Sequence, residues 1–151
     1  MVTLARHHDE CDNISWLTDV QPADLILYAD ESLISQVMIN LLKNAQQAIG
    51  SRYKKQNDLE QTNDYEPVTD MISITASCKK SESIIIEISN NGPAIPEEEV
   101  AHIFIPFFTT KEYGSGVGLS IVRQIMRLSG GSITHKKDHS SGLTTFTLTF
   151  P

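Results

Sequence analysis

The sequence predicts a single domain of the mixed α/β (α+β) class. Residues 30–50 repeat apolar side chains with the period of a helix, and a second apolar helical pattern follows the glycine-rich segment 114–118. Several shorter stretches alternate apolar and polar residues, as half-buried strands do. The chain has 151 residues, which is the size of one domain with a substantial core.

Composition excludes several classes of function. Apolar residues make up 40% of the chain, charged residues 21%, and the net charge is −7, which argues against a nucleic-acid partner. Cys11 and Cys78 are too few for a disulfide framework and lack metal-ligand spacing. The chain shows neither a signal segment at Met1 nor a run of about eighteen apolar residues, so we expect a cytoplasmic domain. Its parent protein could still be anchored in the inner membrane.

The first residues of the chain predict little regular structure. Residues 1–13 are polar and aperiodic and are expected to form a flexible N-terminal segment or linker. Two adjacent histidines occur here, but side chains of neighbouring residues point apart and lack metal-ligand spacing. Alternation over residues 14–20 predicts a strand, and residues 25–28 predict a second, joined to the first by a turn at Gln21-Pro22.

The long helix expected over residues 30–50 has two distinct faces. Asp30 is its predicted N-cap, with Glu31 in the first turn. One arc of a helical wheel is apolar and predicts the core-facing side; it holds Ile34, Val37, Met38, Leu41, Ala45, Ala48 and Ile49. A neighbouring line carries uncharged amides at Gln36, Asn40, Asn44 and Gln47. Neutral amides beside a core indicate a polar site that is partly shielded from water.

The middle of the chain predicts a loop and then a hairpin. Residues 51–70 are charged and nearly free of large apolar side chains, so we expect a loop that is either solvated or used for docking or regulation. Residues 72–76 and 84–89 predict two antiparallel strands, and the isoleucine-rich second strand should lie centrally in its sheet.

The last third of the chain carries the strongest local signals. A turn at residues 90–96 precedes a short acidic helix at 97–102 and a phenylalanine-rich segment at 103–111, whose rings are by themselves more typical of a core than of a cofactor site. Glycines at alternate positions in 114–118 precede a helix, an arrangement that suits a phosphate but also a flexible connector. Gly130-Gly131 ends that helix, and strands at 133–137 and 143–150 form a terminal hairpin.

Four segments, in this order, resemble the ATP-binding catalytic domain of sensor histidine kinases, in the superfamily that also contains gyrase, heat-shock chaperones and mismatch-repair ATPases. They are the asparagine box NLLKNA, the first glycine box NNGPAIP, the phenylalanine box IFIPFFTTK and the second glycine box GSGVGL. The resemblance covers about residues 14–151. It implies a two-layer α/β sandwich, in which a mixed, mainly antiparallel sheet of about five strands lies under three helices. ATP would lie between the helical layer and a short lid.

The resemblance also implies which residues bind ATP and Mg²⁺. Asn44 matches the family's magnesium ligand, and Asn40 faces the same cleft one turn earlier; both would be catalytic. The glycine loop would supply N–H groups to the phosphates. The complete set implied for the nucleotide is Asn40, Asn44, Gln47, Asn90, Gly92, Ala94, Ile95, Phe107, Lys111, Gly114, Ser115, Gly116, Val117, Gly118, Leu119 and Thr144.

Two positions depart from the family pattern. Asn90 stands where an aspartate usually accepts a hydrogen bond from the adenine amino group, and we expect an affinity loss of about 1–2 kcal/mol, roughly tenfold. Ala94 replaces a glycine, which would strain the chain only if its backbone were left-handed.

The expected function is phosphoryl transfer rather than hydrolysis. The hydrolases of the superfamily carry a water-activating glutamate where this chain has Asn40, which is no base at neutral pH. The acceptor would be a histidine on a helical dimerisation domain outside this chain, and a response regulator would receive the phosphoryl group indirectly. This chain alone should be a monomer. A pseudokinase that acts by docking and a stand-alone ATPase or anti-sigma-type kinase are the alternatives.

Overall fold

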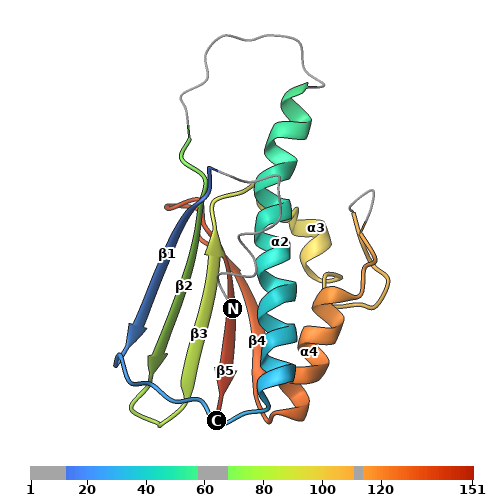
Figure 1. The fold of residues 1–151 in the computed structure, drawn as a ribbon. Helices are drawn as coiled ribbons and strands as arrows, with labels where there is room; N and C mark the ends of the chain where they lie inside the picture. The colour runs from blue at the N-terminus through green and yellow to red at the C-terminus, as the bar shows by residue number, and fades with distance from the viewer. Residues whose placement is uncertain (1–12, 58–67, 111–113) are drawn as a thin grey trace.

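A five-stranded sheet is covered on one face by helices (Figure 1). The computed structural model describes residues 13–57, 68–110 and 114–151, together with the backbone but not the side chains of 54–57. The elements are β1 (Ser15–Gln21), α2 (Glu31–Asn57), β2 (Met71–Cys78), β3 (Ile84–Asn90), α3 (Glu97–Val100), α4 (Gly118–Leu128), β4 (Ser132–Lys137) and β5 (Thr144–Phe150). This two-layer arrangement of helices on a sheet confirms the predicted fold class.

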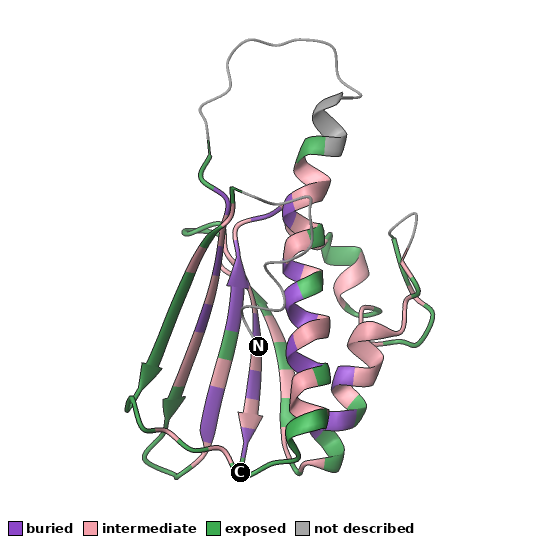
Figure 2. Cartoon of the chain, in the orientation of Figure 1, coloured by how far each residue is buried: buried purple, intermediate pink, exposed green. Residues whose placement is uncertain are grey.

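The strand order is β1-β2-β3-β5-β4, with β1 parallel to β2 and the other neighbours antiparallel. The sheet is therefore mixed and mainly antiparallel, as expected, and the isoleucine-rich β3 is its central strand. Figure 2 shows the consequence for burial: β3 is largely buried, whereas the edge strand β1 is mostly exposed. Both predicted hairpins, β2-β3 and β4-β5, are confirmed.

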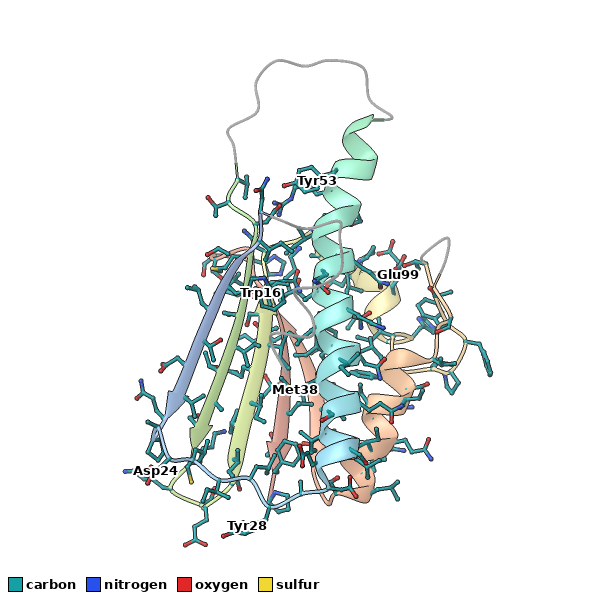
Figure 3. The ribbon with its side chains drawn as sticks, viewed as in Figure 1. Trp16, Asp24, Tyr28, Met38, Tyr53 and Glu99 are labelled. Atoms are coloured by element: carbon teal, nitrogen blue, oxygen red, sulfur yellow. The ribbon has the colours of Figure 1, made fainter. Side chains whose placement is uncertain are left out.

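The core lies between the sheet and α2. Ile74, Ile88 and Phe146 occupy paired positions on three adjacent strands, and each is at most 6% exposed. The helical layer contributes the predicted stripe of α2, including Met38 on the side facing the sheet (Figure 3), and an apolar face of α4. Burying this many large side chains provides most of the driving force for folding.

The long helix begins as predicted but ends later. The Asp30 carboxylate accepts hydrogen bonds from the N–H groups of Ser32 and Leu33 at 2.9 and 3.1 Å, which confirms the N-cap. The expected end at Gly50 is wrong, because α2 continues to Asn57 through the first part of the predicted loop. A glycine inside a helix costs only about 1 kcal/mol, and Arg52 and Tyr53 offset it by binding Asp70.

Two further expectations are corrected. Residues 25–28 form no strand: alternate side chains, Leu25 and Leu27, pack against the core, but the extended segment lacks a partner strand among the described residues. The short acidic helix ends at Val100 instead of residue 102 and passes into turns. The expectations for residues 1–12 and for 58–67 of the loop lie outside the described residues. No helix in the described part of the chain is long and apolar enough to span a bilayer.

Candidate functional site

A buried polar pair lies at the end of the central strands. Asn90, the last residue of β3, pairs in register with Thr144, the first residue of β5, and each is 3% exposed. Both side chains lie on the sheet face that packs against the helices, because Phe146, Leu148 and Ile88 continue the same alternation into the core. The Thr144 Oγ1 is buried and has no hydrogen-bond partner among the described residues. A buried hydroxyl of this kind is costly unless something else satisfies it.

The turn after β3 presses directly against α2. A Cβ on Gly92 would lie 2.7 Å from the carbonyl carbon of Ala48 and from the backbone nitrogen of Ile49, so only glycine fits. The Gly92 N–H donates to the Asn90 Oδ1 at 3.0 Å. Ala94 has no positive φ, since among the described non-glycine residues only Glu82 and Phe107 do. The glycine-to-alanine departure therefore leaves the backbone unstrained.

The second glycine box forms a loop against the middle of α2. Gly116 has a φ of +68°, and a Cβ there would lie 2.6 Å from the Phe107 backbone. The Phe107 N–H donates to the Gly116 carbonyl at 2.8 Å, which holds this loop to the phenylalanine segment. A Cβ on Gly118 would lie 3.3 Å from the Asn40 Oδ1, so the loop and the amide are neighbours.

The loop ends at an uncapped helix. α4 begins at Gly118, and among the described residues no side chain caps its first-turn N–H groups. Ser115, Val117 and Gly118 also line an open groove of about 680 Å³, together with Asn40 and residues of the first half of α2. A helix N-terminus with free N–H groups favours an anion. These observations place an anion-compatible loop beside Asn40.

α2 connects the buried pair to the glycine loop. Ala48 touches the turn at Gly92, and Asn40 lies beside Gly118. Eight residues at 1.5 Å each separate them by roughly 12 Å, a length that a base, a ribose and phosphates can span. Asn44 lies between them and is half-buried, whereas Gln47 is exposed. Three of the predicted site residues, Asn40, Asn44 and Gln47, thus lie on one helix, which Gly92 and Gly118 approach.

The phenylalanine segment divides its side chains between two environments. Phe104 packs against the core and meets Phe146 edge to face, with 6.5 Å between ring centroids. Phe107 is 79% exposed, so the expectation of a core role for the whole segment is wrong. Its φ of +67° belongs to a turn that directs the side chain outward. Ile95 and Leu119 lie partly buried against the core, and Lys111 lies outside the described residues.

A polar cluster that the sequence did not indicate holds the first glycine box. Arg52 forms an ion pair with the buried Asp70 at 2.7 Å and donates to the Asn91 carbonyl oxygen. Tyr53, labelled in Figure 3 near the end of α2, donates to the other Asp70 oxygen. The Asn91 side chain accepts from the Met71 N–H at 2.8 Å and donates to the Thr69 carbonyl at 2.7 Å. The sequence signal for this cluster was Asp70, a charged residue directly before the strand β2.

Two of the described histidines, His102 and His135, lie against structural neighbours. His102 contacts the Glu98 carbonyl at 3.2 Å and stacks near Phe108, and His135 lies against Phe146. Burial lowers the pKa of His135 below its usual value. No cluster of three or more His, Cys, Asp or Glu side chains able to hold a metal occurs among the described residues.

Residues 29–151 match the model of the family described as Histidine kinase-, DNA gyrase B-, and HSP90-like ATPase. The chain belongs to this family. Within it, the ATPase-like domain is homologous to catalytic domains of sensor histidine kinases. It is 34% identical over 141 residues to the sensory histidine kinase/phosphatase NtrB of Rhizobium leguminosarum bv. phaseoli, covering 92% of this chain and 35% of NtrB. It is 34% identical over 125 residues to the sensor histidine kinase ZraS of Escherichia coli K12, covering 83% of this chain and 23% of ZraS.

Solved structures agree with this membership. The solved catalytic domain of histidine kinase ThkA is 34% identical to this chain, with a TM-score of 0.69. The match covers 92% of this chain and 79% of the ThkA chain. ThkA has also been solved in complex with the response regulator protein TrrA. The match to ThkA in that complex has 31% identity and a TM-score of 0.68, and it covers 92% of this chain and 34% of the ThkA chain. The domain spans about a third or less of the curated relatives named above.

Proposed function

We propose that residues 14–151 bind Mg-ATP and present it for phosphoryl transfer to a histidine on a helical dimerisation domain outside this chain. A response regulator would receive the phosphoryl group from that histidine. Family membership supports ATP as the nucleotide, and the resemblance to sensor kinases supports the acceptor. The reaction uses cellular ATP, so we place the domain in the cytoplasm, as a monomer unless its parent protein dimerises it.

One observation carries the proposal: α2 joins a buried polar pair to an uncapped glycine loop. Asn90 and Thr144, with its unsatisfied hydroxyl, would meet the base. The loop at Gly114–Gly118 and the first turn of α4 would direct N–H groups at the phosphates. A site with a purely structural role would not need an unsatisfied hydroxyl at one end of α2 and uncapped helix N–H groups at the other.

The residues present fit a magnesium ion that is held mainly by the nucleotide. Mg²⁺ prefers oxygen ligands, keeps several waters and commonly bridges phosphates with only one or two protein ligands. Asn44, half-buried between the two ends of the site, would supply one amide oxygen. Bound there, the ion would neutralise charge on the phosphates. Asn40 beside the loop would position the nucleotide without activating water, so intrinsic hydrolysis should be slow.

Calorimetry on the Asn44→Ala variant tests the ligand assignment. We expect the parent chain to bind ATP more tightly with Mg²⁺ than with EDTA, and Asn44→Ala to lose most of that difference. Lys43→Ala, on the exposed side of the same helix, is the matched control and should bind like the parent. Circular dichroism would verify that both variants fold. If Asn44→Ala retained the full magnesium dependence, Asn44 would not be a ligand.

The alternatives predict different outcomes. Asn90 would make a weaker contact with the base than an aspartate, which is the argument for a docking pseudokinase. Such a protein would show no heat of binding at millimolar Mg-ATP. A stand-alone ATPase would release phosphate steadily without any partner. The proposed kinase half would bind Mg-ATP, release little phosphate, and label the histidine domain of its own parent protein when the two are mixed with γ-labelled ATP.

A further inference from the structure

Asn91, the first residue after β3, bonds to the protein through each of its four polar groups. Its backbone N–H donates to the Met71 carbonyl at 3.3 Å, and its side-chain oxygen accepts from the Met71 N–H at 2.8 Å. Its side-chain NH₂ group donates to the Thr69 carbonyl at 2.7 Å, and its backbone carbonyl accepts from Arg52. Asn91 therefore ties the turn that follows β3 to the start of β2.

The Arg52 guanidinium joins the same turn to α2. One terminal nitrogen, Nη1, lies 2.7 Å from an Asp70 carboxylate oxygen, and the other, Nη2, donates to the Asn91 carbonyl. A guanidinium carries its nitrogens in a rigid fork, so one side chain serves both acceptors at once. A lysine ammonium is a single donor site on a flexible stem, so it can keep the ion pair without fixing the turn.

The turn held in this way contains the first glycine box. Asn91 lies between the buried Asn90 and Gly92, whose N–H donates to the Asn90 Oδ1. Gly92 in turn packs against the backbone of Ala48, where there is no room for a Cβ. Ala48 and Arg52 are four residues apart on α2 and lie on the same side of it. One face of the helix therefore holds the turn at two points, and a displacement of Asn91 would move both of its neighbours.

We propose that Arg52 and Asn91 are positioning residues for nucleotide binding: they hold the turn after β3 where Asn90 meets the nucleotide, without touching the nucleotide themselves. The inference rests on the proposed function and adds two residues to its site. Their loss should weaken ATP equally with and without Mg²⁺, because the turn lies away from the proposed metal ligand Asn44. A cluster with a structural role alone would leave the affinity of the folded chain unchanged.

The Arg52→Lys variant of the 151-residue chain separates positioning from stability. Lysine keeps a cation beside Asp70 but loses the forked bond to the Asn91 carbonyl. We expect calorimetry well below the melting temperature to give a dissociation constant for ATP about three- to tenfold larger than that of the parent, both with Mg²⁺ and with EDTA. Lys43→Ala, on the exposed side of α2, is the matched control and should bind like the parent.

Amide hydrogen exchange provides a second readout. Asn91→Ala removes both side-chain bonds to the residues at the start of β2 and should weaken ATP in the same way as Arg52→Lys. In both variants the Gly92 amide should exchange faster relative to the amide of Ile88, in the middle of β3, because only the turn opens more often.

Three outcomes would overturn the inference. Parent-like ATP affinity in Arg52→Lys and Asn91→Ala would show that binding does not depend on how the turn is held. A loss seen only with Mg²⁺ would assign both residues to the metal end of the site. Equal acceleration of exchange at Gly92 and Ile88 would reduce the cluster to a contribution to global stability. If the parent chain itself failed to bind ATP, the proposed function would be refuted, which the first titration shows before any variant is compared.

Discussion

Replacing Arg52 with methionine should destabilise the domain far more than loss of a surface ion pair. The Arg52 side chain is 14% exposed and the Asp70 side chain 6%, and their atoms approach to 2.7 Å. Methionine keeps much of the apolar stem but leaves the Asp70 carboxylate buried beside a lone Tyr53 hydroxyl. Removing one partner of a buried pair typically costs about 3–5 kcal/mol. For a domain of this size the melting temperature should fall by roughly 6–20 °C.

Urea denaturation followed by circular dichroism would measure this loss. The double variant Arg52→Met/Asp70→Leu is the informative control, because replacing both charges with apolar groups removes the uncompensated carboxylate and should recover most of the stability. Lys43→Ala should unfold at the parent's urea concentration. A loss below about 1 kcal/mol for Arg52→Met would mean that water screens the pair as it does on a surface, and the burial argument would fail.

Three further substitutions test a close backbone contact and the burial of His135. Gly92→Ala should lower the free energy of unfolding by about 1–3 kcal/mol, because its Cβ would meet the α2 backbone at 2.7 Å. Gly50→Ala, with open space around its Cβ, should raise it by about 0.5–1 kcal/mol. Equal effects of the two substitutions in urea titrations would contradict the contact. His135 has a lowered pKa through burial, so the unfolded chain takes up a proton first and the free energy of unfolding should fall as the pH drops below about 6.5. His135→Phe should remove that part of the pH dependence, and an unchanged profile in thermal melts between about pH 7 and 5.5 would refute it.

Much of the fold was predictable because burial imposes simple periods on the sequence. The central strand β3 packs isoleucines among buried neighbours, and its hairpin with β2 follows from alternation alone. The stripe on α2 was predicted because a helix against a sheet must bury one arc. The end of α2 was not predictable from local residues. Gly50 is a local stop signal, and the Arg52–Asp70 pair that overrides it joins residues eighteen positions apart.

The site was predictable in its chemical types but not in its geometry. Motif resemblance selected Asn40, Asn90 and Thr144. Only the structure shows that the Thr144 hydroxyl has no hydrogen-bond partner in the described part of the chain, and that the Asn90 oxygen accepts from Gly92. The sequence-based view of Asn90 was a weakened acceptor for adenine. The structure adds that this oxygen already accepts a hydrogen bond from the Gly92 N–H, a neighbour that a motif does not specify.

α2 makes the two ends of the site mechanically dependent on each other. Gly92 touches its backbone at Ala48 and the glycine loop meets it at Asn40, so a shift of this one helix would move both ends of the proposed nucleotide site. The ion pair of Arg52 with Asp70 anchors the same helix beyond Ala48, and Arg52 also binds Asn91 in the turn after β3. Arg52→Met should therefore weaken ATP binding equally with and without Mg²⁺, whereas Asn44→Ala should lose only the magnesium-dependent part. This difference separates a residue that positions the turn from one that binds the metal.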